Sequence, residues 1–320
     1  MKKILMISLT ISLLLMNHGS WAKQSWQKWV NDLRVEAIEQ GIDPGLFDEV
    51  FSGLTPNQQV LRFDRTQPEK RLTFTKYRNT RADSYRIQLG QKKYKKYRKL
   101  LEKVGKDFDV DPCFITSLWG LETSYGHYMG NFPVIKSLAT LAYDSRRSQF
   151  FRQELLYALE ILNDGHVTQD KFKGEWAGAS GHPQFLPSSW HNFAVDYTGD
   201  GRRDIWTSHA DAFASIANYL KQNGWQSGQP WAIQVKLPAK FDKRLEGKDK
   251  TKQVSEWDEL GVRLMDGDHL PYQNLSAAIV VPHGGPAFLA FENFKVIMSY
   301  NNSIYYAGTV GYMADKICRR

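Results

Sequence analysis

Cysteine is scarce in this chain of 320 residues, which contains only Cys113 and Cys318. A bacterial lipoprotein is therefore excluded, because it would need a cysteine directly after the cleavage point of its leader peptide. Two cysteines in an exported protein could pair with each other, but the sequence does not give the distance between their Cα atoms. Their redox state stays open from the sequence alone.

Long apolar runs are also lacking. The run from Ile4 to Met16 has 13 residues, whereas a membrane-spanning helix needs about 20. Lys2 and Lys3 precede this run, and small residues stand at positions −3 and −1 of a cleavage site after Ala22. This pattern is typical of a secretory signal peptide. We expect residues 1–22 to be removed, which leaves an exported protein without a membrane anchor.

The composition is that of a globular protein, with 42% hydrophobic and 13% aromatic residues, and it excludes intrinsic disorder. Lysine and arginine number 42 against 34 acidic residues, a formal charge of +8. Six of the eight residues from Lys92 to Lys99 are basic. This excess of basic residues indicates an anionic partner or surface but does not identify it.

Apolar periodicity predicts a mainly helical chain. We expect helices over residues 24–40, 44–51, 89–104, 150–162 and 211–222, an extended segment from Leu61 to Ser84, and a Gly- and Pro-marked loop between the last two helices. Asp111 and Pro112 are typical of an N-cap and first turn, and predict another helix after them.

The pattern changes after residue 228. Ile233, Val235 and Leu237 alternate with polar residues, and Ala277–Val281 is a short β-like run, which predicts strands. Helical patterning returns after residue 290. The predicted fold class is α+β, mainly α. We expect a signal peptide (1–22), an N-terminal helical region packing on the core (23–110), a catalytic core (111–228), a small β-rich subdomain (229–290) and a C-terminal segment returning to the core (291–320).

Glu122 falls on the apolar face of the helix that begins at Pro112. Ile115, Leu118, Trp119 and Glu122 recur at i, i+3, i+4 and i+7, so a carboxyl stands where the pattern expects an apolar residue. Burial raises a carboxyl pKa, as a general acid near neutral pH requires. A helix-end glutamate paired with a lysine or arginine is the alternative that spacing leaves open.

Two motifs extend this reading. The sequence Trp-Gly-Leu-Glu-Thr-Ser-Tyr-Gly at 119–126, followed by Gly-Ala-Ser-Gly-His-Pro-Gln-Phe-Leu-Pro-Ser-Ser at 178–189, resembles the B-type lytic murein transglycosylases, which cut the glycan strands of peptidoglycan. The similarity extends from Val60 to Trp231 and from Ser299 to Ala307. It implies a lysozyme-like helical domain with a groove, and Glu122 as the only catalytic carboxylate.

The resemblance also implies the reaction. The bond between N-acetylmuramic acid and N-acetylglucosamine is cleaved to leave a 1,6-anhydromuramoyl end, and no cofactor is required. One glutamate serves both halves, because it can first protonate the glycosidic oxygen and then accept the proton of the attacking C6 hydroxyl. A hydrolytic muramidase is the closest rival, and it would leave reducing ends.

Groove residues follow from the same resemblance. Gln184 corresponds to a substrate-contacting glutamine, and the tract at 300–306 corresponds to an element that faces the catalytic glutamate and walls the groove. The residues assigned to substrate binding are Gln184, Tyr219, Tyr300, Asn301, Tyr306, Tyr77 and Glu175. The chain departs from the pattern at Ser180, where Met is usual, and at Glu175, where Ser is common. Glu175 would bring a second acidic group near the groove.

The segment Asp196 to Arg202 resembles the opening of a calcium loop, with oxygen ligands at positions 1, 3 and 5 and glycine at 6. Thr207 stands at position 12, where such loops have Glu, and Arg202 and Arg203 oppose cation binding. A simple Asp-Gly turn is the alternative. The residues predicted for a structural Ca²⁺ are Asp196, Thr198, Asp200, Arg202 and Asp211.

The expected partner is peptidoglycan, in the periplasm, and the protein is expected to be a monomer that binds no nucleic acid. A non-catalytic wall-binding protein and an exported nucleic-acid binder using Lys92–Lys99 are the alternatives from other classes. The sequence does not separate cleavage within strands from cleavage at their ends, or peptide-bearing from bare glycan. Wall-synthesis proteins as partners stay open.

Overall fold

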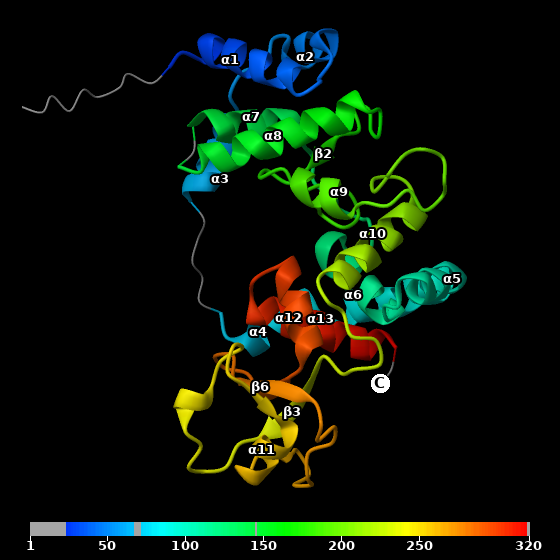
Figure 1. Ribbon diagram of the computed structural model, residues 1–320, viewed down its shortest axis with the longest axis vertical. Coiled ribbons are helices and arrows are strands. Elements are labelled where there is room, and N and C mark those ends of the chain that lie inside the picture. The colour runs from blue at the N-terminus through cyan, green and yellow to red at the C-terminus, as the bar shows by residue number, and fades with distance from the viewer. Residues whose placement is uncertain (1–23, 67–71, 145, 319–320) are drawn as a thin grey trace, which may run out of the picture.

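The computed structural model describes residues 24–66, 72–144 and 146–318, and the predicted signal peptide lies outside these ranges. The described chain is mainly helical, with a five-stranded and a two-stranded sheet, which confirms the predicted fold class. Figure 1 shows α1 and α2 at one end, the helical core in the middle and the larger sheet at the other end. None of the described helices is long and apolar enough to cross a membrane.

The first two helices form where the sequence predicts them, as α1 (Trp26–Glu39) and α2 (Pro44–Phe51). The side chains of Ser25 and Asp43 cap them by accepting hydrogen bonds from backbone N–H groups of their first turns. Their apolar faces share one core with α7 (Val134–Asp144) and α8 (Ser148–Asn163). In that core the ring of Trp29 meets Tyr143 edge-on at 5.7 Å.

The prediction of an extended segment from Leu61 to Ser84 is wrong. The described parts of it contain the end of α3 (Gln58–Arg65) and all of α4 (Phe74–Arg81). Asn57 and Thr73 cap these helices, and each helix buries only one or two side chains, among them Val60 and Phe74. Because so few positions are apolar, the helical period is hidden in the sequence.

The central core is built around α6 (Pro112–Thr123), which is buried on nearly every face. The basic helix α5 (Ser84–Phe108), α10 (His209–Gln222), α12 (Glu292–Tyr300) and α13 (Ile304–Ile317) supply the surrounding side chains. Cys113 on α6 and Cys318 after α13 form a disulfide bond. The bond ties the returning C-terminal segment to the start of the α6 helix.

The chain between α6 and α10 holds more structure than the sequence predicted. β1 (Phe132–Pro133) pairs with β2 (Lys173–Gly174) in antiparallel register. The helix α7 had not been anticipated, and the expected loop before α10 contains α9 (Pro187–Phe193). Pro187 stands at the first turn of α9, a position at which proline favours a helix start and which we had interpreted as a loop signal.

The larger sheet has the order β4-β6-β7-β3-β5 and is antiparallel throughout. Its strands are β3 (Ala232–Lys236), β4 (Thr251–Gln253), β5 (Arg263–Leu264), β6 (Ser276–Val280) and β7 (Ala287–Ala290). The short helices η1 (Lys243–Leu245) and α11 (Val254–Glu259) lie between strands, and Trp257 of α11 is fully buried in the apolar core of this unit. We keep the boundaries at 110, 228 and 290 as a proposed domain division.

Candidate active site

Glu122 lies in the last turn of α6, and the backbone reverses immediately after that helix. Ser124, Tyr125 and Gly126 have φ values of 49°, 61° and 81°, so three consecutive residues adopt the left-handed region. Two of them are not glycine, which makes the turn a strained one that surrounding contacts must hold. The Tyr125 hydroxyl donates to the Arg86 carbonyl at 3.0 Å, and this bond ties the turn to α5.

A buried polar pair supports the same turn of α6. The indole N–H of Trp119 donates to Nδ1 of His182 at 3.0 Å, and this joins the two sequence motifs. Burial, together with the neighbouring His209 ring, lowers the pKa of His182 to about 4. The imidazole is therefore neutral at pH 7 and can accept this hydrogen bond.

The Glu122 carboxyl is half-buried and hydrogen-bonded to one side chain. Tyr306 of α13 donates its hydroxyl to Glu122 Oε1. Burial raises the pKa of Glu122 to about 7, although the Tyr306 bond and the charge of Arg81 both lower it. The predicted carboxyl of raised pKa is thus present, and its hydrogen-bond partner in the described chain is a tyrosine, not a lysine or arginine.

Tyr77 and Arg81 reach the neighbourhood of Glu122 from α4. The Glu122 charge raises the pKa of Tyr77, though less than burial does, and the Tyr77 ring contacts Tyr305 edge-on at 5.8 Å. Sequence analysis missed Arg81 because we interpreted this segment as extended. At helical spacing, residues 77 and 81 share one face, and that signal was present in the sequence.

Tyr219 and Tyr300 lie together beside this group, and their hydroxyls bind backbone. Their ring centroids are 4.7 Å apart, and the ring of Tyr300 stacks parallel to that of Tyr306 at 6.4 Å. Tyr219 donates to the Ser299 carbonyl at 2.6 Å, and Tyr300 donates to the Pro183 carbonyl. The first bond ties α10 to the end of α12, and the second ties that end to the loop that carries Gln184.

Gln184 adopts a left-handed conformation with φ 51°. Its amide nitrogen donates to the carbonyls of Met129 at 3.2 Å and Gly181 at 2.9 Å. Both amide protons are used within the protein, so the side-chain oxygen is the atom left to accept a hydrogen bond from a ligand.

Asn301 and Ser180 differ in exposure. Asn301 is exposed after the end of α12, and its backbone carbonyl accepts from Ser303 N–H at 2.6 Å. No described hydrogen bond joins its side chain to Glu122.

Ser180 is buried, and its hydroxyl accepts from the Trp206 indole at 3.3 Å.

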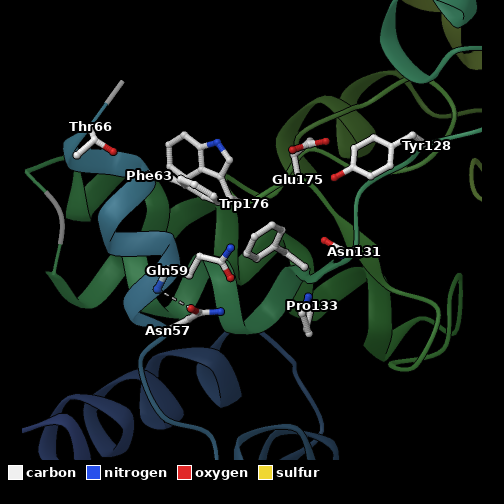
Figure 2. A pocket seen from close by; sticks show the side chains of 10 residues that line it. Asn57, Gln59, Phe63, Thr66, Tyr128, Asn131, Pro133, Glu175 and Trp176 are labelled. Carbon is white, nitrogen blue, oxygen red and sulfur yellow. Dashed lines mark hydrogen bonds between the residues drawn. The ribbon is translucent and has the colours of Figure 1, made fainter. Parts of the chain in front are cut away.

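Glu175 lines a separate cavity of about 820 Å³. Its ten lining residues are Asn57, Gln59, Phe63, Thr66, Tyr128, Asn131, Phe132, Pro133, Glu175 and Trp176 (Figure 2). Glu122 is not among them. The expected second acidic group therefore lies in this cavity and has no described contact with the Glu122 carboxyl.

A second buried carboxyl, missed by sequence analysis, belongs to Glu154 of α8. Its two oxygens accept from the Ser188 backbone N–H at 2.9 Å and from the Ser188 hydroxyl at 2.6 Å. This carboxyl therefore caps the first turn of α9. Because both oxygens are engaged within the fold, Glu154 has a structural role.

The Asp196 loop is held by its own backbone. Asp196 accepts hydrogen bonds from the N–H groups of Gly199, Asp200 and Gly201. Asp211 accepts from three backbone N–H groups, those of Tyr197, Thr198 and Asp204. Burial raises its pKa, and the negative charge of Asp196 adds to this effect. In the described ranges no group of three or more acidic, histidine or cysteine side chains could hold a metal. The other oxygens available to a cation are the Thr198 hydroxyl and backbone carbonyls.

The arrangement around Glu122 is suited to proton transfer. A carboxyl with a pKa near 7 is partly protonated at neutral pH, so it can donate a proton and afterwards accept one. The aromatic rings of Tyr77, Tyr300 and Tyr306 lie near it, and such rings contact sugar rings well.

Comparisons with known proteins agree with this geometry. A family model described as a transglycosylase SLT domain matches residues 25–315. The membrane-bound lytic murein transglycosylase B of Escherichia coli (strain K12) is 29% identical over 314 residues, covering 92% of this chain and 82% of that protein. SltB3 from Pseudomonas aeruginosa, in complex with NAG-anhNAM-pentapeptide, is similar with a TM-score of 0.90 and 43% identity, over 92% of this chain and 80% of that one. Escherichia coli Slt35 in complex with calcium has a TM-score of 0.78 and 27% identity, over 91% and 92%.

Proposed function

The chain belongs to the transglycosylase SLT domain family and is a peptidoglycan lytic transglycosylase, and from this premise we propose that Glu122 is its single catalytic acid and base. The observation that carries the proposal is the half-buried Glu122 carboxyl, whose pKa is raised to about 7 and whose described partner is the Tyr306 hydroxyl. The lysozyme-like fold predicted from the two motifs agrees with the solved relatives.

In the first step the protonated Glu122 donates its proton to the glycosidic oxygen. The bond from the muramoyl C1 to that oxygen breaks, and the electron pair leaves with the oxygen. The N-acetylglucosamine hydroxyl departs, and positive charge develops on the muramoyl ring. The proton that Glu122 loses is the one the leaving group gains, so the step is balanced.

In the second step the Glu122 carboxylate takes the proton of the muramoyl C6 hydroxyl, and the oxygen bonds to C1. The product is a 1,6-anhydromuramoyl end, no water is added, and Glu122 is again protonated. The Tyr306 hydroxyl donates to the ionised carboxylate between the two steps and stabilises it.

The neighbouring groups bind the glycan in this proposal. The free oxygen of Gln184 accepts an N–H of an N-acetyl group. Tyr300 and Tyr306 form one wall, Tyr219 supports it, and Tyr77 and Asn301 contact sugar at the edges. Arg81 keeps the Glu122 pKa from rising further.

We further propose that the protein acts in the periplasm after removal of residues 1–22, as a monomer. A Ca²⁺ held by Asp196, Thr198, Asp200, Arg202 through its backbone carbonyl, and Asp211 would stabilise that loop and take no part in the reaction. The structure of Slt35 with calcium supports this.

The test is mass spectrometry of the soluble fragments that the wild-type protein and Glu122→Gln release from purified peptidoglycan. We expect fragments one water lighter than hydrolysis products from the wild type and none from Glu122→Gln. Glu259→Gln, which changes an exposed glutamate on α11, is the matched control and should release wild-type fragments. Water-added products would make the protein a hydrolase, and an active Glu122→Gln would overturn the role of Glu122.

A further inference from the structure

The Glu175 cavity contains a carboxylate without a described partner. Glu175 is half-buried, and among the described residues no hydrogen bond or ion pair reaches its side chain. Burial raises its pKa, and among the described residues no cation compensates the charge. Leaving a partly buried carboxylate unpaired costs stability, and a ligand that brings a positive charge would recover it.

The walls of this cavity are aromatic. The ring of Phe63 lies 6.0 Å from Phe132 and 6.3 Å from Trp176. Figure 2 shows the Phe63 and Trp176 rings close together on one side, while the Glu175 carboxylate and the Tyr128 hydroxyl point toward each other on the other. Aromatic faces attract cations, so the walls and the carboxylate favour the same kind of ligand.

The cavity is connected to the catalytic turn by a short piece of chain. Residues 124–131 lead from the end of α6 to β1, and β1 pairs with β2, which Glu175 follows directly. A Cβ atom at Gly130 would lie 2.0 Å from the Gly174 carbonyl carbon, so the chain just before β1 packs directly against β2 there. Met129, in the same piece of chain, accepts the hydrogen bond from Gln184. The chain that follows Glu122 therefore contacts both the Gln184 side chain and the strand that precedes Glu175.

We propose that this cavity binds the peptide stem of peptidoglycan through a free ammonium group, with Glu175 as the counter-ion. The proposal rests on the proposed function and names the part of the substrate that would confer selectivity. The glycan itself offers hydroxyl and amide groups, which do not need an unpaired carboxylate. A stem that contains a diamino acid carries an ammonium group, and the amides of Gln59 and Asn131 suit its peptide bonds.

The experiment compares two soluble peptidoglycan chains that differ only in whether the stem amine is free or N-acetylated. The kcat/KM for anhydro products is measured on both with the wild-type protein, Glu175→Gln and the matched control Glu259→Gln. We expect wild type and control to prefer the free amine by about tenfold, the size of one charge-assisted hydrogen bond, and Glu175→Gln to lose that preference. A wild type without preference, or a preference that survives in Glu175→Gln, overturns the proposal.

Binding of the free pentapeptide, measured by calorimetry with the same three proteins, separates the two proposals because it needs no catalysis. Weaker binding of the N-acetylated peptide to the wild type, and equal binding of both peptides to Glu175→Gln, would support the ammonium site even if the chain released no anhydro products. Anhydro products from both substrates at equal rates, with equal binding of both peptides, would leave the proposed function intact and refute the ammonium site.

Discussion

The Tyr306 hydroxyl donates a hydrogen bond to Glu122 Oε1 across a sequence separation of 184 residues. Tyr306 lies in the first turn of α13, where Ser303 caps the helix, and Glu122 lies in the last turn of α6. The C-terminal segment therefore returns to the core and supplies the hydrogen-bond donor to the Glu122 carboxyl. The bond stabilises the charged form and holds the Glu122 pKa below the value that burial alone would give.

Tyr306→Phe should move the pH profile of activity upward. Activity requires protonated Glu122 for the first step, so kcat/KM should fall as the pH rises through about 7. Removing a bond that lowers the Glu122 pKa raises this pKa, and the falling limb then moves to higher pH. The measurement is kcat/KM for anhydro products from pH 5 to pH 9. Tyr305→Phe is the control, because the Tyr305 hydroxyl binds the His283 carbonyl and not Glu122. If the falling limb of the pH profile stayed in place in Tyr306→Phe, the Tyr306 hydroxyl would not lower the Glu122 pKa.

Glu122→Gln should stabilise the fold at high pH relative to the wild type. The folded-state pKa of about 7 lies above the ordinary value of 4.5, so between these values the folded protein binds more protons than the unfolded chain. Wild-type stability then falls as the pH rises from about 4.5 to about 7, by at most about 3 kcal/mol. Glutamine does not titrate, so its stability advantage should grow from pH 4 to pH 8 in urea unfolding, whereas Glu259→Gln should show no such growth. A constant difference would mean that Glu122 is not buried as described.

The features that could be predicted from the sequence depend on the period of a single helix or on a single motif. The helix at Pro112, its cap Asp111 and the inward position of Glu122 follow from spacing, and the family resemblance supplied Tyr306. Each of these depends on residues close together in the chain or on a motif of fixed letters.

The sequence did not predict what depends on chain segments meeting in space. The positions of Arg81 and Tyr77 needed α4, whose single fully buried residue, Phe74, gives no period. The Glu175 cavity could be predicted only from the packing of α3 near β1 and β2. The Cys113–Cys318 bond could be predicted only from the return of α13 to the core. Helix α7 was missed although its apolar residues Val134, Leu138, Leu141 and Ala142 recur at helical spacing, so the signal for it is present in the sequence.

Reduction of the disulfide should destabilise the protein by about 2–5 kcal/mol, because the bond restricts the unfolded chain. The closed segment is long, with a sequence separation of 205 residues. Urea midpoints of the wild type with and without a reductant measure the effect. The double variant Cys113→Ala/Cys318→Ala should not respond to the reductant. A fully reduced wild type with an unchanged midpoint would refute this stabilisation.

Calcium should raise the melting temperature of the wild-type protein if the Asp196 loop holds the ion. Ligand binding to the folded state stabilises by about 1.4 kcal/mol when free Ca²⁺ is ten times its Kd. Asp196→Asn should lose most of this response, whereas Asp249→Asn, which changes an exposed aspartate, should keep it. Activity should not change with chelator at a temperature well below melting. If the wild-type protein melted at the same temperature with and without Ca²⁺, the proposed Ca²⁺ site would be refuted.

Two substitutions of Gln184 should separate its backbone role from its side-chain role. The residue has φ 51°, a conformation that costs an alanine about 1 kcal/mol and a glycine almost nothing. Gln184→Gly should therefore be more stable than Gln184→Ala by about 1 kcal/mol in urea unfolding. Both variants lose the amide oxygen proposed to bind an N-acetyl group, so both should show the same rise in KM for peptidoglycan fragments. If the KM of Gln184→Gly stayed at the wild-type value, the side chain would not bind substrate.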